Sequence, residues 1–387
     1  MTTARNGLLK TFGTAAADPF DVGAGEILPS DAFDPGLAYD AGLFEYAAFS
    51  CENNTQIFSD GSCAFLASIG IPSDGSDLNL PSIGIGDLVG VQTVTRTVTS
   101  VANNSGWKTY NVSVDAPPGI DVSVSPSTLT LKKGMSASYE VTFTVNSEAN
   151  LNEWTFGSLS WDRPAEYSVR SPIAVRPSAF STVDNVEGVA DGSGDGSVDV
   201  PVVFGYEGAY SASVSGLEGG FSAAQNLTVG VGVHAWCANL PANSHFRTAL
   251  FDEDTSDPGN DDLDLELFYL PGGCGNFAGF QFIGDSLTPT SEEFVDLPNG
   301  PAGGYHVQVR FFSAANGTDS NYRVWFQPVL GDNGNTTVTA PASATLGNAD
   351  TVTVDYTGIA PTRNLGVLHH NDGSGEIART ILDIDAR

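Results

Sequence analysis

The segment FDEDTSDPGNDDLDLELF, residues 251–268, is the densest group of potential ligands in the chain. Carboxylates packed this closely repel one another unless water solvates them or a cation is shared, and Ca²⁺ prefers such hard oxygen ligands. The spacing is not that of an EF-hand loop, whose glycine and final glutamate do not fall in register here. The calcium ligands that we predict are Asp252, Asp254, Asp257, Asp261, Asp262 and Asp264. The alternative is that these acids, together with Glu253, form a loop that is solvated by water and binds no cation.

The four cysteines fall into two local pairs, Cys51 with Cys63 and Cys237 with Cys274. Neither pair has the Cys-x-x-Cys spacing that is typical of metal sites. Two disulfides are therefore the favoured interpretation, and they would fit an oxidising compartment. Four buried free thiols remain the alternative.

Nucleophilic catalysis needs a nucleophile, a base that takes its proton and a group that orients the base. The five histidines that could act as the base are His234, His245, His306, His369 and His370. None of them stands in a glycine-rich turn beside a serine, and the chain has no Gly-x-Ser-x-Gly, His-Glu-x-x-His or phosphate-binding loop. We therefore predict no catalytic residue in this chain.

The elements that would position these groups are mainly β-strands. Segments such as QTVTRTVTSV, residues 92–101, and ASYEVTFTVN, residues 137–146, alternate polar and β-branched or aromatic residues with the period of two that strands have. About seven such strands fall within about 100 residues, which is typical of an immunoglobulin-like or fibronectin type III-like sandwich.

After a Gly/Asp/Ser-rich linker at 184–200, more alternating segments predict a second sandwich of jelly-roll type that ends near residue 330. The fold class that we expect is mainly β, with tandem antiparallel sandwiches and a short helical or irregular N-terminal segment. The domain ranges that we predict are 1–77, 78–177, 178–331 and 332–387, the last of them a small immunoglobulin-like β unit.

The formal net charge of the chain is −31, from 46 acidic and 15 basic residues. A polyanion would be repelled by this charge, so a nucleic-acid partner is not expected. The sequence contains no run of 18 apolar residues, so we predict no membrane span. It also does not begin with a recognisable signal peptide.

The first 175 residues resemble the subtilase family of subtilisin-like serine proteases, in the form of its larger plant members. The resemblance covers these segments in the family's order: MTTA (1–4), PFDVGAGEILPSDAFDPGLAYD (19–40), DLNLPSIGI (77–85), VTRTVTSV (94–101), PPGIDVSVSPSTLTL (117–131), FGSLSW (156–161) and VRSPIAV (169–175). It implies that residues 1–77 are the end of a subtilisin-like catalytic domain and that residues 78–177 are a fibronectin type III-like domain.

The second half is similar to the pre-peptidase-like C-terminal β-domains of bacterial subtilases. This resemblance rests on HFRTALFDEDT, DLDLELF, GGYHVQV and TVTAPASATLG. It implies that residues 178–331 form such a pre-peptidase-like domain.

The family's catalytic Asp, His and Ser lie in Asp-[Ser/Thr]-Gly, His-Gly-Thr and Gly-Thr-Ser-Met contexts, all upstream of the MTTA segment, and none of these contexts occurs here. The resemblance therefore implies that Met1 is internal to a longer, secreted protease whose signal peptide lies upstream. We expect a non-catalytic C-terminal region that supports stability, Ca²⁺ binding or contact with the catalytic portion or a protein substrate.

An autonomous extracellular binding or adhesion module is the alternative, for which the aromatic pairs Phe311/Phe312 and Trp325/Phe326 would be suited. On the first hypothesis, residues 1–40 have lost the core against which they pack and should be mobile or poorly packed. The apolar residues concerned are Leu8, Leu9, Phe12, Phe20, Ile27 and Leu28.

Overall fold

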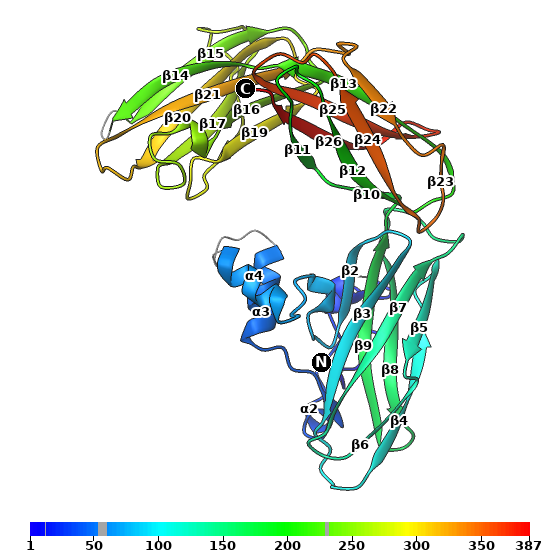
Figure 1. Ribbon diagram of the computed structural model, residues 1–387. Coiled ribbons are helices and arrows are strands. Elements are labelled where there is room, and N and C mark those ends of the chain that lie inside the picture. Colours follow the sequence, from blue (N-terminus) through cyan, green and yellow to red (C-terminus); the bar gives the residue numbers. More distant parts are fainter. Residues whose placement is uncertain (12, 53–59, 229–231) are drawn as a thin grey trace. The chain divides into compact units, whose positions relative to one another are not determined.

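The computed structural model describes residues 1–11, 13–52, 60–228 and 232–387 (Figure 1). Most of these residues lie in β-strands and few lie in helices, so the predicted fold class is confirmed. The chain divides into two compact units. The first comprises residues 1–181 with 203–207 and 345–348, and the second comprises 182–202, 208–344 and 349–387.

The N-terminal segment of the first unit carries all of the α-helices in the described residues. The helical elements are α1 (Pro19–Val22), α2 (Pro29–Ala32), α3 (Leu43–Glu52), α4 (Asp60–Ser68) and the 3-10 turn η1 (Gly75–Asp77). Asp18 begins α1, because its carboxylate accepts the backbone N–H groups of Phe20 and Asp21. These helices agree with the short helical or irregular N-terminal segment that the sequence predicted.

A two-layer sandwich follows. Its strands are β1 (Leu37–Ala38), β2 (Ile83–Leu88), β3 (Val91–Ser100), β4 (Lys108–Asp115), β5 (Ile120–Ser125), β6 (Thr128–Leu131), β7 (Ser136–Val145), β8 (Thr155–Arg163) and β9 (Tyr167–Pro177). The sheets have the orders β1-β3-β7-β5 and β2-β9-β8-β4-β6. All neighbours are antiparallel except β2 and β9, which run parallel.

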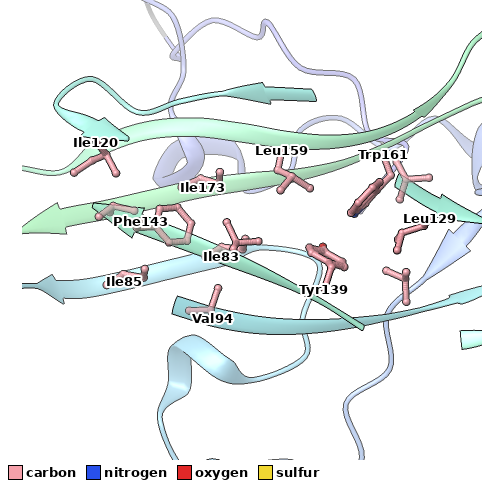
Figure 2. Close-up of a cluster of buried hydrophobic side chains, with 14 of the residues drawn as sticks. Ile83, Ile85, Val94, Ile120, Leu129, Tyr139, Phe143, Leu159, Trp161 and Ile173 are labelled. Carbon is pink, nitrogen blue, oxygen red and sulfur yellow. The ribbon is translucent and has the colours of Figure 1, made fainter. Parts of the chain in front are cut away.

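The core of this sandwich follows from the alternation along its strands. On β7, Tyr139, Val141 and Phe143 are buried, and the residues between them face away from the core. They meet Leu159 and Trp161 of the opposite sheet (Figure 2). The Tyr139 and Trp161 rings are edge to face, with centroids 5.0 Å apart.

The end of the N-terminal segment is packed on this sandwich. Leu37 is fully buried, and the Tyr39 hydroxyl hydrogen-bonds to the Tyr139 hydroxyl at 2.7 Å. The prediction of poor packing is therefore wrong for residues 37–40, because strand β1 adds to the edge of β3. Leu9, Phe20 and Ile27 are largely exposed, whereas Leu8 and Leu28 are half-buried; Phe12 lies outside the described residues.

The second unit holds two further sandwiches. The first is built from β10 (Phe180–Thr182), β11 (Asn185–Val189), β12 (Gly196–Phe204), β13 (Gly208–Gly219), β22 (Thr336–Thr339), β23 (Ser343–Ala344), β24 (Ala349–Tyr356), β25 (Arg363–Asp372) and β26 (Glu376–Asp385). The second is built from β14 (Phe221–Thr228), β15 (Val233–Leu240), β16 (His245–Leu250), the turn η2 (Asp252–Asp254), β17 (Asp262–Leu270), β18 (Gln281–Ser286), β19 (Glu293–Pro298), β20 (Gly303–Ser313) and β21 (Asp319–Val329).

This arrangement corrects the predicted division at 331/332. Strand β25 pairs with β13 on one side and with β26 on the other, and β26 pairs in parallel with β11. Residues 332–387 therefore complete a sandwich with residues 182–219 and do not form a separate small unit. The sheets β14-β21-β16-β19 and β15-β20-β17-β18 form a sandwich inserted between β13 and β22.

The inserted sandwich has its own apolar core. Phe246, Leu265 and Val307 are fully buried in it, together with Tyr305 and Val324. Among the described residues, no helix is both long and apolar enough to cross a bilayer.

Candidate functional site

The acidic segment 252–264 does not gather its carboxylates at one point. Asp252 accepts the Ser291 backbone N–H at 2.8 Å, and Asp254 accepts the Trp325 indole N–H at 2.8 Å. Asp257 accepts the Asn260 side-chain amide at 3.0 Å. Each of these carboxylates thus serves as a local hydrogen-bond acceptor.

Asp261 is the structural centre of the segment. It is 1% exposed, and its Oδ1 accepts the Ala315 N–H at 2.9 Å. Its Oδ2 accepts the Ser320 hydroxyl at 2.6 Å and the Asp257 N–H at 3.0 Å. Over the ranges that the structure describes, no three His, Cys, Asp or Glu side chains are arranged to hold a metal ion. Calcium binding by this segment stays a prediction.

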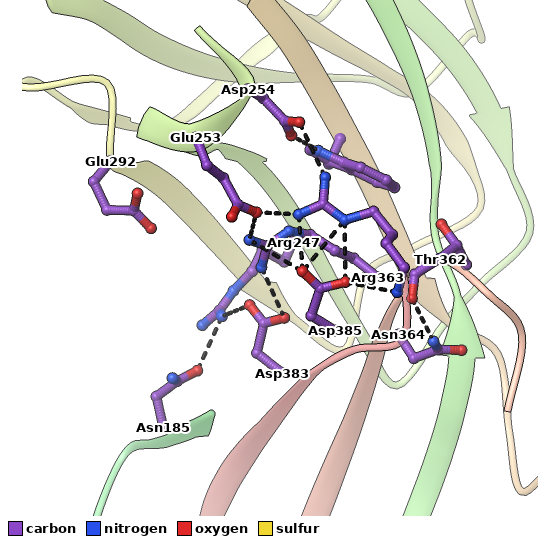
Figure 3. Close-up of polar contacts among 12 residues, drawn as sticks. Asn185, Arg247, Glu253, Asp254, Glu292, Thr362, Arg363, Asn364, Asp383 and Asp385 are labelled. Carbon is purple, nitrogen blue, oxygen red and sulfur yellow. Dashed lines mark hydrogen bonds and ion pairs between the residues drawn. The ribbon is translucent and has the colours of Figure 1, made fainter. Parts of the chain in front are cut away.

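The acids at the start of the segment belong instead to an ion network between the two sandwiches of the second unit (Figure 3). Arg363 pairs with Glu253 at 2.6 Å, and Arg387 pairs with Glu253 and with Asp254. Arg247, 3% exposed in its side chain, is the buried member of the network. The acidic run therefore helps to fasten the inserted sandwich to the sandwich that carries it.

Asp262 and Glu293 are both buried, and each has an oxygen without a hydrogen-bond partner in the described structure. They are 7% and 0% exposed, and the unpartnered atoms are Asp262 Oδ1 and Glu293 Oε2. Burial, together with the charges of Asp264, Glu293 and Asp252, raises the pKa of Asp262 to about 6. Asp262 and Asp264 line a surface cavity of about 250 Å³.

Asp262→Asn is expected to raise the free energy of unfolding of the second unit at pH 7.5 by roughly 1–3 kcal/mol. Between the ordinary Asp pKa and about 6, the folded state holds the Asp262 proton more tightly than the unfolded state does. Raising the pH through this window therefore costs stability, and asparagine removes that cost. At pH 4 the variant should gain nothing. Urea unfolding at both pH values measures the difference.

The matched control is Asp350→Asn on the exposed surface of β24, which should change stability by less than about 0.5 kcal/mol at either pH. Equal gains at pH 4 and pH 7.5 would contradict the assignment to Asp262 ionisation. The same series with Ca²⁺ added tests the calcium prediction: binding through this carboxylate requires that Ca²⁺ stabilise the natural chain and not Asp262→Asn.

Both cysteine pairs are joined in the structure. One disulfide links Cys51 and Cys63, on helices α3 and α4. The other links Cys237 on β15 to Cys274 in the loop after β17. No free cysteine occurs among the described residues.

Each of the five histidines has a polar partner. His234 hydrogen-bonds to Tyr322, His245 to Asp296, His306 to Gln308, and His370 to both Tyr210 and Thr380. His369 has a serine on one side and a carboxylate on the other: its Nε2 lies 3.0 Å from Ser215 Oγ, and its Nδ1 lies 2.6 Å from Glu376 Oε2.

This chain of serine, histidine and carboxylate has the connectivity of a nucleophile, its base and an orienting acid. The contact between this serine and this histidine could not be predicted from the sequence. Ser215 and His369 are 154 positions apart, and they meet only because β13 pairs with β25. The N–H of Gly216, which follows the serine, donates to the Gly331 carbonyl at 2.6 Å and is not available to an oxyanion. The group is thus a cross-strand polar ladder that lacks this donor of an acyl-transfer site.

The N-terminal segment exposes large apolar side chains to an unusual degree. Leu9, Ile27, Phe33, Leu43 and Phe44 are 59%, 74%, 86%, 78% and 56% exposed, and we call them the N-terminal apolar surface. Large apolar side chains that are exposed in this way are candidates for contact with another protein surface.

A polar cavity of about 750 Å³ lies in the same unit, between the N-terminal segment and the sandwich. Its lining includes Asp34, whose carboxylate accepts the Tyr167 hydroxyl at 2.9 Å, and Arg170, whose backbone N–H donates to the Thr2 carbonyl. These bonds hold the segment on the sandwich while its apolar side chains remain exposed.

A family model described as "Fibronectin type-III domain" matches residues 77–175. The chain is 38% identical over 186 residues to the "CO(2)-response secreted protease" of Arabidopsis thaliana, 46% of this chain and 24% of that protein. It is 35% identical over 163 residues to "Subtilisin-like protease SBT2.5" of the same plant, 41% of this chain and 19% of that protein. The chain thus spans about a fifth to a quarter of the length of these relatives.

Among solved structures, the "Secreted serine protease VesC from Vibrio cholerae" is similar over 65% of this chain and 50% of that chain, with 12% identity and a TM-score of 0.20. A similarity this low does not establish a shared fold or function. The sequence matches are specific, and they agree with the sandwich of residues 83–177 described above. This chain therefore carries a fibronectin type-III domain at residues 77–175, and over 41–46% of its length it is similar to secreted and subtilisin-like proteases.

Proposed function

We propose that the chain is a non-catalytic C-terminal region of a secreted subtilisin-like serine endopeptidase, and that its N-terminal apolar surface packs against the catalytic domain. The observation that carries the proposal is the exposure of this surface in a segment that is anchored to a fibronectin type-III domain of subtilase type. Burying five such side chains would supply about 1.5–3 kcal/mol each.

The ion network and the buried core of the second unit support a role in stability. A protein substrate in place of the catalytic domain is the alternative occupant of the N-terminal apolar surface. Calcium binding remains a separate prediction, tested by the Asp262→Asn series.

The test joins the full chain of 387 residues to the catalytic part of the similar secreted protease, in place of the matched region of that protease. We expect an active, secreted protease, and we expect Phe33→Asp with Leu43→Asp to lower its yield at least tenfold, because two charges would then enter a buried interface. Val189→Asp is the matched control, since Val189 is 78% exposed but lies in the second unit. Equal yields from the three proteins would refute docking through this surface.

The chain alone provides the test of the non-catalytic assignment. It should hydrolyse neither casein nor peptides and should not react with a fluorophosphonate probe. Labelling that disappears in Ser215→Ala would overturn the assignment and would make the Ser215–His369–Glu376 group an active site.

A further inference from the structure

A group of phenylalanine rings lies exposed on the outer face of the inserted sandwich. Phe277, Phe280 and Phe282 are 56%, 56% and 55% exposed, and all three fall within six residues of chain. The Phe268 ring lies 6.2 Å from that of Phe280 and 5.5 Å from that of Phe282, measured between centroids. Phe277 stands edge-on to His306, at 5.4 Å. We call these four phenylalanines and His306 the phenylalanine patch.

Strand register places the patch on one open sheet. His306 on β20 is opposite Phe268 on β17, and Phe268 is opposite Phe282 on β18. The residues that alternate with them, such as Leu267 and Val307, point into the core. The rings of Phe277, Phe280 and Phe282 therefore lie outside this core and remain exposed.

The loop that carries the patch is fixed in place. The disulfide from Cys274 to Cys237 ties it to β15, and the Cys274 N–H donates to Asn239 Oδ1 at 2.8 Å. The Phe280 N–H closes a turn on the Phe277 carbonyl at 3.3 Å. Rings held in this way lose little conformational entropy when a ligand covers them.

The patch is uncharged in a chain of net charge −31. Residues 270–282, LPGGCGNFAGFQF, contain no ionisable group other than the disulfide-bonded cysteine. Burial lowers the pKa of His306, which keeps its ring neutral at neutral pH. The adjoining row holds Gln308, Glu266 and Asp285, and Arg310 is paired with Glu266 at 2.9 Å. A cationic or anionic ligand would therefore find no opposite charge within the patch itself, and the acids beside it would repel a polyanion.

We infer that the phenylalanine patch binds a neutral polysaccharide. The C–H groups on one face of a sugar ring stack on aromatic rings, and this contact needs no charge on either partner. The Gln308 side-chain amide, whose Nε2 lies 3.2 Å from His306 Nε2, both donates and accepts hydrogen bonds, as sugar hydroxyl groups require. The sequence had pointed to two other aromatic pairs for such a role. Trp325 and Phe326 are 3% exposed and belong to buried clusters, whereas Phe311 packs against the core and Phe312 is exposed. The inference does not depend on the proposed function, because it concerns the second unit alone.

The test uses the full chain in sedimentation with four insoluble neutral polysaccharides, namely cellulose, chitin, β-1,3-glucan and starch, and in affinity electrophoresis with anionic polygalacturonate. We expect retention on at least one neutral polymer and none on polygalacturonate. The triple variant Phe277→Ser, Phe280→Ser, Phe282→Ser should lose at least tenfold in affinity. Phe312→Ser is the matched control, because Phe312 is 72% exposed on the same sheet but outside the patch.

Thermal unfolding of each variant, which should match that of the natural chain, shows that the fold is kept. No retention on any neutral polymer, or equal retention of the triple variant, would overturn the inference. Sedimentation equilibrium provides a further check: a natural chain that dimerises and a triple variant that does not would assign the patch to contact between copies of this chain instead, and would also overturn it.

Discussion

Arg247→Ala is expected to lower the free energy of unfolding of the second unit by about 3–5 kcal/mol, because it removes a buried cation that pairs with both Asp296 and Asp383. The guanidinium group donates to both oxygens of Asp296, from Nε and from Nη2, at 2.9 Å each. Its Nη1 donates to Asn185 at 2.9 Å and to Asp383 at 3.3 Å (Figure 3). Asp383 is only 5% exposed, so water cannot replace the lost partner. Unfolding in guanidinium chloride, followed by circular dichroism, measures this loss of stability.

The control for this prediction is Arg310→Ala, which breaks an exposed pair with Glu266 and should cost less than about 1 kcal/mol. A loss of similar size in both variants would show that burial does not set the energy of the Arg247 network.

The acid dependence of stability should change in the same variant. Burial alone would raise the pKa of Asp296, but hydrogen bonds from His245 and Arg247 outweigh it and lower the pKa to about 2. The resulting stability is present above the ordinary Asp pKa and is lost as the pH falls toward 2. Without Arg247 the pKa of Asp296 in the folded state rises toward the ordinary Asp value, so this acid-dependent loss of stability should become smaller, which melting curves between pH 2 and pH 7 would detect.

Trp161→Ala is expected to cost the fibronectin type-III domain about 3–5 kcal/mol, the range for removing a large aromatic side chain from a core. Trp161 is fully buried on β8 and contacts Tyr139 of the opposite sheet (Figure 2). The cavity would open between the two sheets, where strands on both sides limit collapse. The transition of the first unit in urea, followed by circular dichroism, measures the effect.

Trp107→Ala provides the comparison, because the Trp107 ring is 59% exposed and contacts only the ammonium of Lys132 among the aromatic and cation–π contacts described for it. It should change stability by less than about 1 kcal/mol. If Trp161→Ala cost no more than this control, the two-sheet core of Figure 2 would not be the source of the domain's stability.

The sequence by itself determined the local features of this protein. Alternation along residues 137–146 specified strand β7 and its buried face, because side chains on a strand point to opposite sides in turn. Cys51 and Cys63 are 12 positions apart in the sequence, so a disulfide between them was the simplest pairing to predict. The motifs of the first 175 residues carried the resemblance to subtilases, and a subtilisin-like protease is 35% identical to this chain over 163 residues.

Only the tertiary structure decided which segments meet. Alternation specifies the faces of a strand but not its neighbour, so the return of β25 and β26 to β13 and β11, across an inserted sandwich, could not be read from the pattern. For the same reason, the contact between Ser215 and His369 could not be predicted from the sequence.

The fate of the acidic segment and of the aromatic residues has the same physical origin. Neighbouring acids such as Asp261 and Asp262 lie on backbone that turns into a strand, so their side chains have different surroundings: Asp261 Oδ1 accepts the Ala315 N–H, whereas Asp262 Oδ1 has no hydrogen-bond partner in the described structure. Alternation also leaves open which face of a sheet another layer will cover. The packing of the second unit buried Trp325 and left Phe277, Phe280 and Phe282 exposed.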